Sequence, residues 1–277
     1  SEVFRPALLF LIVAAIWITT SELNATVVMT VQTSLMFVTA VALFFILRLG
    51  LRAEIAPEPS EYETKAWLRI GMPLLLISLF GHYVPEFMVI LLGPQIASDQ
   101  VAIFNASYRL ALLIAFGLGA IDSFTAPVAA RLFAAKEVNE LEAVVRRATK
   151  LGFLCSVTAV AVFAVFGRPL LGLFGAEFVV GHGTMMILAA AQLVRSAAGP
   201  VMSLMSVTGH QDHCLVVFAS ALVAAVILVF ILVPTYGIHG AAVTVLLVTL
   251  GWSTWLHRLV VSQVGIRPSI FHAFARV

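Results

Sequence analysis

Four ionisable side chains lie in stretches of this sequence that otherwise consist mostly of apolar residues. The stretch "FGHYVPEFMVILLG", residues 80–93, contains His82 and Glu86, and two later apolar stretches contain Arg109 and Arg195. A charge at the centre of a lipid bilayer costs roughly 2.5–3.5 kcal/mol on insertion scales, so it requires an opposite charge or a hydrated cavity. If these stretches cross a membrane, the four side chains are the candidates for chemistry.

Composition places them in a membrane protein. Of the 277 residues, 61% are hydrophobic and only 11% are charged, whereas a soluble domain of this size needs far more charge on its surface. The apolar residues form blocks of about 20, the length that spans a hydrocarbon core roughly 30 Å thick. We therefore predict an all-α, polytopic membrane protein of about eight transmembrane helices, near residues 6–21, 27–47, 68–93, 101–127, 151–174, 184–208, 213–233 and 238–260.

Positive charge is distributed unevenly between the loops that join these spans. Almost all Lys and Arg residues outside the spans fall on one side of the predicted topology, and Arg168 falls on the other. Because cytoplasmic loops carry an excess of Lys and Arg, the richer side and both termini are predicted to be cytoplasmic. No charge run or basic, aromatic patch suggests binding of nucleic acid.

Two segments between the spans are polar. Residues 50–66 contain Pro57, Pro59 and several glutamates, which is typical of an exposed linker. Residues 138–151 place apolar side chains at helical spacing, with acidic residues early and basic residues late. The second segment is predicted to be an amphipathic helix that lies along the cytoplasmic membrane surface.

The spacing around Glu86 predicts an ion pair. Pro85 lacks an N–H, so the carbonyl of Gly81 loses its usual helical partner and the helix is expected to be irregular beside the acid. His82 lies four residues before Glu86 and can share its face. If the third and fourth spans turn near Ala97, Glu86 and Arg109 lie at similar depth. We expect them to pair in at least one conformation, either functionally or only to hold the hairpin in register.

Arg195 lies about midway along the sixth predicted span. Gln192 and a series of small residues share its helical face, which is typical of a cavity wall or of a close contact between helices. Asp122 is expected near the cytoplasmic end of its span, where its charge can reach the interface.

No nucleotide-binding fingerprint and no nucleophile–base arrangement indicates an enzyme. The string "GHQDH", residues 209–213, is better explained as a short polar loop than as a metal site. No metal and no cofactor are predicted.

The run "PEFMVILLGPQIASDQVAIFNASYRLALL" resembles the polysaccharide and O-antigen flippases of the multidrug/oligosaccharidyl-lipid/polysaccharide exporter superfamily. Those proteins carry an acidic residue, an Ile-Leu-Gly step, a short loop, a tyrosine and an arginine-bearing helix. Glu86, Tyr108 and Arg109 occupy these positions here, with Glu86 where the family more often has aspartate. "LFGAEFVVG" and "VPTYGIHGAAVTVLL" resemble later loop signatures of the family, and the resemblance runs from about Trp67 to Trp255.

This resemblance implies two six-helix lobes that rock around a central cavity. Residues 1–49 would be the last two helices of an incomplete first lobe, residues 50–66 a cytoplasmic linker and residues 67–277 the second lobe. The implied cargo is a lipid-linked oligosaccharide of the undecaprenyl pyrophosphate type, carried across the bacterial cytoplasmic (inner) membrane. Membrane lipids and other envelope polysaccharide assembly proteins are the implied partners. A chain without most of its first lobe is not expected to transport alone.

Side-chain chemistry then assigns the roles. A guanidinium fork matches phosphate oxygens, so Arg195, Arg109 and the neighbouring Gln192 are predicted to bind substrate. Glu86 and His82 are predicted to couple transport to a proton or cation. One alternative is a drug/cation antiporter of the multidrug extrusion branch, whose cavity should be richer in acids. A second is a membrane-embedded enzyme of envelope glycan assembly, and a third is a scaffold that does not transport.

Overall fold

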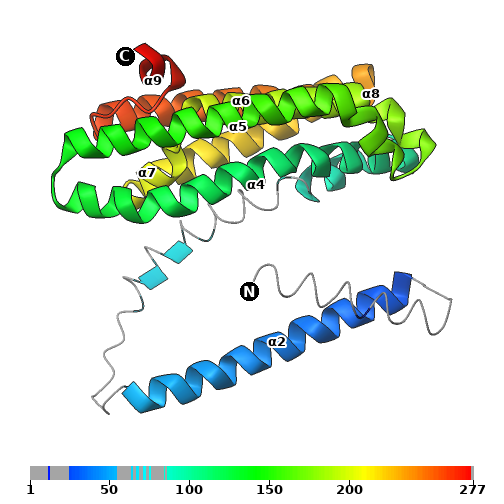
Figure 1. Cartoon of the computed structure of the whole chain (residues 1–277). Coiled ribbons are helices and arrows are strands. Elements are labelled where there is room, and N and C mark those ends of the chain that lie inside the picture. The colour runs from blue at the N-terminus through cyan, green and yellow to red at the C-terminus, as the bar shows by residue number, and fades with distance from the viewer. Residues whose placement is uncertain are drawn as a thin grey trace. The chain divides into compact units, whose positions relative to one another are not determined.

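The computed structural model describes residues 25–54 and 86–275, together with isolated positions at 12, 64, 67, 68, 71, 72, 75 and 84. The regular structure of these residues is helical (Figure 1), and five of the helices are long and apolar enough to cross a membrane. The predicted fold class, all-α and polytopic in the membrane, is confirmed. The chain divides into two compact units, Ser1–Glu63 and Thr64–Val277.

The first unit contributes one long described helix, α2 (Ala25–Glu54). It covers the predicted span 27–47 and continues for seven residues beyond it. Large apolar side chains along it, such as Met29, Phe37 and Leu49, are exposed. Apart from residue 12, the predicted span at 6–21 lies outside the described residues, as does half of the one at 68–93.

The second unit contains a short helical segment that folds back onto the start of α4 (Ser98–Ala134). Residues 86–92 are helical, and the backbone N–H groups of Gln95 and Ile96 donate to the carbonyl of Leu92 to close a tight turn. Leu92 is buried in the same apolar cluster as residues of α4. The predicted hairpin is present, with its turn at residues 93–97.

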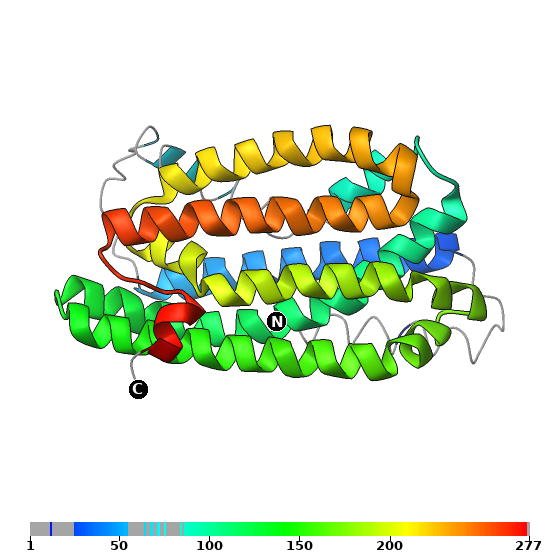
Figure 2. The same ribbon diagram turned by 90° about the horizontal axis from the view of Figure 1, so that it is seen from above.

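α4 and α5 (Val138–Gly172) form a second hairpin and lie side by side (Figures 1 and 2). They contain 37 and 35 residues, so each is more than 50 Å long and exceeds a hydrocarbon core of about 30 Å. The prediction of a separate surface helix at residues 138–151 is wrong. Gly152 lies at the junction with the span that follows, but it is helical and packs against Leu118 of α4; the apolar stripe also packs on α4, so α5 is continuous.

The predicted span at 184–208 is a broken helix. It begins after a 3-10 turn, η1 (Ala176–Gly181), and comprises α6 (His182–Ala198) and α7 (Val201–Val207). Gly199 adopts φ +80°, a conformation that residues with a Cβ rarely adopt, and Pro200 lacks the N–H that would continue the helix. The break lies only four residues after Arg195.

The last two predicted spans are the two arms of α8 (Gln211–Gln263), which reverses direction at Gly237, φ 56° and ψ −134° (Figure 2). A Cβ on Gly240 would collide with the carbonyl of Leu232, so the arms meet closely at this turn. A short helix, α9 (Ile270–Ala275), follows and packs against α5.

Candidate functional site: a buried cavity and an exposed polar helix face

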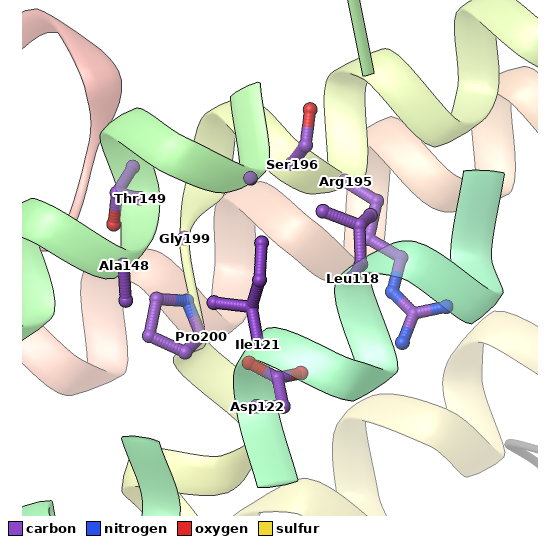
Figure 3. A pocket seen from close by; sticks show the side chains of 10 residues that line it. Leu118, Ile121, Asp122, Ala148, Thr149, Arg195, Ser196, Gly199 and Pro200 are labelled. Atoms are coloured by element: carbon purple, nitrogen blue, oxygen red, sulfur yellow. The ribbon is translucent and has the colours of Figure 1, made fainter. Parts of the chain in front are cut away.

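Arg195 lies in the last turn of α6, where the helix ends at Gly199. A cation is favoured there because the carbonyl groups of a helix C-terminus carry partial negative charge. Its side chain is half-buried and extends from α6 toward α4, which carries Asp122 (Figure 3). The broken helix therefore brings a charged group into the interior of the second unit, which an unbroken apolar helix would not do as readily.

A small cavity lies beside this arginine. It has a volume of about 30 Å³, and three helices and the break after α6 line it (Figure 3). Its lining residues are Leu118, Ile121, Asp122, Ala148, Thr149, Gly152, Arg195, Ser196, Gly199 and Pro200. Since one water needs roughly 10–15 Å³, this volume suits one or two water molecules and is far too small for a drug or a glycan.

Asp122 is the acidic residue that lines the cavity together with Arg195, and opposite charges in a poorly solvated interior attract each other. No hydrogen bond or ion pair within 4 Å joins them in the part of the chain that the structure describes, so a bridging water fits the gap better than direct contact. α4 continues for three turns beyond Asp122 to Ala134, and the location of Asp122 near the membrane interface stays a prediction. The sequence does carry a signal for Asp122. An arginine within an apolar span predicts that an acidic side chain of another helix faces it.

The packing around the break is tight. The hydroxyl of Thr149 on α5 donates to the carbonyl of Pro268, 2.8 Å away. A Cβ placed on Gly199 would lie 2.6 Å from each of these two oxygens. The break, α5 and the segment before α9 are thus held together by a contact that only glycine permits.

Gln192 lies one turn before Arg195 but does not line the cavity. Its side chain is only 7% exposed, and its Oε1 has no hydrogen-bond partner among the described residues. The predicted pairing of Gln192 with Arg195 in one binding surface therefore remains a prediction.

Glu86 and Arg109 belong to a different surface. Both side chains are exposed, and Nε of Arg109 donates to Oδ1 of Asn105 at 3.3 Å, not to Glu86. The two are offset because the turn begins at residue 93. Glu86 is six residues from the end of its helix, about 9 Å, whereas Arg109 is eleven residues into α4, about 16 Å. In this conformation the expected ion pair is absent, and His82 lies outside the described residues.

Tyr108 directly precedes the exposed Arg109 on α4. It is buried, and it stacks on Phe104 with ring centroids 5.8 Å apart. Sequence reasoning used Tyr108 only as a family marker.

No known family model and no curated protein matches the sequence. Solved structures do match the fold. A MATE protein in a straight conformation gives a TM-score of 0.69 at 19% identity, covering 92% of this chain and 60% of that one. A multidrug resistance MATE family transporter in an outward-facing conformation gives 0.67 at 18% identity, with the same coverage.

A third neighbour is a transporter of the MOP superfamily from Pyrococcus furiosus, with a TM-score of 0.66 at 19% identity. Its description states that the reverse polarity of its binding pocket suggests a different function. Our chain covers 92% of its own length but spans about three-fifths of these structures. The chain shares its fold with part of these solved transporters, and none of the three is described as a polysaccharide flippase.

Proposed function

We propose that this chain is part of an alternating-access membrane transporter that exchanges an organic cation for a proton or metal cation. One observation carries the proposal: Glu86 and Arg109 are exposed on a helical hairpin whose buried side packs into an apolar cluster. Arg109 lies about 16 Å from the start of its helix. If that start is at the membrane surface, the guanidinium lies near the middle of a hydrocarbon core about 30 Å thick and does not easily reach the interface. Such a charge is tolerated only beside water or protein.

The polar face therefore lines an aqueous chamber that the rest of the transporter completes. Asn105 and Arg109 mark this face on α4, and Glu86 marks it on the facing segment. An exposed carboxylate inside a membrane chamber is a suitable group for binding a proton or a cationic cargo in turn. The solved neighbours described as multidrug transporters support a drug or cation cargo over the lipid-linked glycan expected from the sequence motifs.

A second candidate, export of a lipid-linked oligosaccharide pyrophosphate, rests on the arginines. Arg109 is exposed on the chamber side of α4, and guanidinium groups match diphosphate oxygens. The neighbour whose binding pocket has reverse polarity is a precedent for a different cargo on this fold. Arg195 contributes less to this candidate, because its cavity holds no more than one or two waters.

Transport by the full-length protein in proteoliposomes separates the two candidates. We expect uptake of a fluorescent organic cation driven by an imposed proton or sodium gradient. Glu86→Gln should reduce that uptake at least about tenfold, and Arg109→Gln should reduce it much less. Gln95, a polar residue of the nearby turn, offers a control as Gln95→Ala. Absence of cation uptake, together with Arg109-dependent movement of a polyprenyl pyrophosphate glycan, would select the flippase instead.

A further inference from the structure

The end of α8 that leads into α9 carries two adjoining surface grooves of contrasting chemistry. One groove, about 720 Å³, is lined mainly by apolar residues of the second arm of α8, including Leu247, Leu250, Gly251 and Trp255. The other, about 460 Å³, is lined by the basic residues of this end of the chain together with Ser262, Ser269 and the apolar Val261 and Phe271. Arg258 and Ser262 line both grooves, so the two are continuous.

The second groove is positively charged. Its lining includes His257, Arg258, Arg267 and His272, and no acidic residue. Arg258 and Arg267 are exposed, and Arg267 Nη1 lies 3.0 Å from Nε2 of His272, which therefore accepts its hydrogen bond. In the part of the chain that the structure describes, no carboxylate forms an ion pair with either arginine. The pair of guanidinium groups is available to an anion.

A buried nitrogen at the same place also lacks a partner. Nδ1 of His257 is buried without a hydrogen bond to any of the described residues, although its ring lines the groove. A buried polar atom without a partner costs free energy. This nitrogen is enclosed by protein atoms, so it is an unsatisfied polar group beneath the groove beside the two arginines.

The sequence indicates that the grooves lie near the level of the lipid headgroups. Trp255, 45% exposed, precedes Arg258 by one turn, and tryptophan is enriched where the bilayer meets water. From Leu247 to Ser262 the helix rises about 22 Å, so the apolar groove extends toward the hydrocarbon while the basic groove lies at its edge. Phe271, 81% exposed on α9, flanks the basic end.

We propose that these grooves bind one anionic phospholipid, with its phosphate between Arg258 and Arg267 and an acyl chain along Leu247, Leu250 and Gly251. Basic pockets at the cytoplasmic ends of membrane helices recognise anionic headgroups in this way, and the predicted topology places this end in the cytoplasm. The site is separate from the polar face of Glu86 and Arg109, so it does not depend on which cargo is transported.

Native mass spectrometry of the full-length protein with phosphatidylglycerol and with phosphatidylethanolamine tests the headgroup. We expect the protein to retain phosphatidylglycerol but not phosphatidylethanolamine. In the double variant Arg258→Gln/Arg267→Gln, the affinity for phosphatidylglycerol should be about tenfold weaker. The matched control is Arg131→Gln/Arg147→Gln, which removes the same charge from exposed positions on α4 and α5. Equal binding of both lipids, or an equal loss in the control, would overturn the proposal.

A second variant tests the acyl groove without touching charge. A Cβ on Gly251 meets nothing within 4 Å, so Gly251→Phe should fold and fill the groove. We expect it to weaken phosphatidylglycerol at least about fivefold and to leave binding of glycerol phosphate unchanged, while Gly117→Phe on α4, equally unobstructed, has no effect. If glycerol phosphate or inorganic phosphate binds as tightly as the lipid, the site recognises free phosphate and the lipid assignment is wrong.

Discussion

The two charged regions of the second unit use similar residues in opposite environments. Arg195 and Asp122 face a cavity of about 30 Å³ inside the helix bundle, whereas Arg109 and Glu86 are exposed on its surface. A cavity that admits only water can hold helices in one arrangement but cannot take cargo. An exposed charge at membrane depth stabilises little by itself and requires an aqueous chamber. We infer that the first region maintains the lobe and the second contacts what the transporter moves.

The largest expected effect lies at the helix break beside the cavity. Gly199→Ala forces a Cβ against the oxygens of Thr149 and Pro268 at 2.6 Å and strains a backbone with φ +80°. We expect a loss of about 3 kcal/mol in the free energy of unfolding, measured by denaturant titration of the full-length protein in detergent. Gly117→Ala, in open space on α4, is the control and should change stability by no more than about 1 kcal/mol. Equal effects would show that the break is not tightly packed.

A smaller effect is expected from the charges across the cavity. Asp122→Asn leaves Arg195 without its acid and should cost about 2 kcal/mol, less than for a fully buried pair because both groups are half-exposed. A double-mutant cycle with Arg195→Gln should give a coupling of about 1 kcal/mol. The same cycle on Glu86 and Arg109 should give no coupling. If the second cycle shows the larger coupling, the assignment of the two regions is reversed.

The smallest effect concerns the hydrogen bond that supports the break. Thr149→Val removes the bond to the carbonyl of Pro268 and should destabilise the protein by about 1 kcal/mol. Thr158 on the same helix bonds only the preceding turn, at the carbonyl of Leu154, and is exposed. Thr158→Val should therefore change stability by less than about 0.5 kcal/mol. If the two variants lose the same free energy of unfolding, the hydrogen bond to Pro268 does not support the break.

Hydropathy alone predicted where helices cross the membrane, because a span must be long and apolar whatever its neighbours are. It did not predict the break after Ala198, since small and apolar residues continue through it. The fusion of residues 138–151 into α5 was also missed, because an amphipathic stripe fits a packed helix as well as a membrane surface.

The sites were harder to predict than the spans. Arg195 and Arg109 were identified from their cost in lipid, but which acid faces which arginine depends on tertiary packing. Glu86 and Arg109 do not pair in this conformation because Glu86 lies about 9 Å before the turn and Arg109 about 16 Å into the helix after it. Asp122 and Arg195 line the same cavity from α4 and α6, and no local spacing in the sequence connects them.

Thiol labelling of the full-length protein in sealed membrane vesicles tests the central claim most directly. With Cys155 and Cys214 replaced by alanine, single cysteines are introduced as Asn105→Cys on the polar face, Val165→Cys on the exposed apolar surface of α5, and Thr149→Cys at the cavity. A water-soluble, membrane-impermeant reagent is predicted to modify Asn105→Cys from at least one side of the membrane and to leave the other two unmodified. If Asn105→Cys proves as unreactive as Val165→Cys from both sides, the polar face does not line an aqueous chamber and the transport account is wrong.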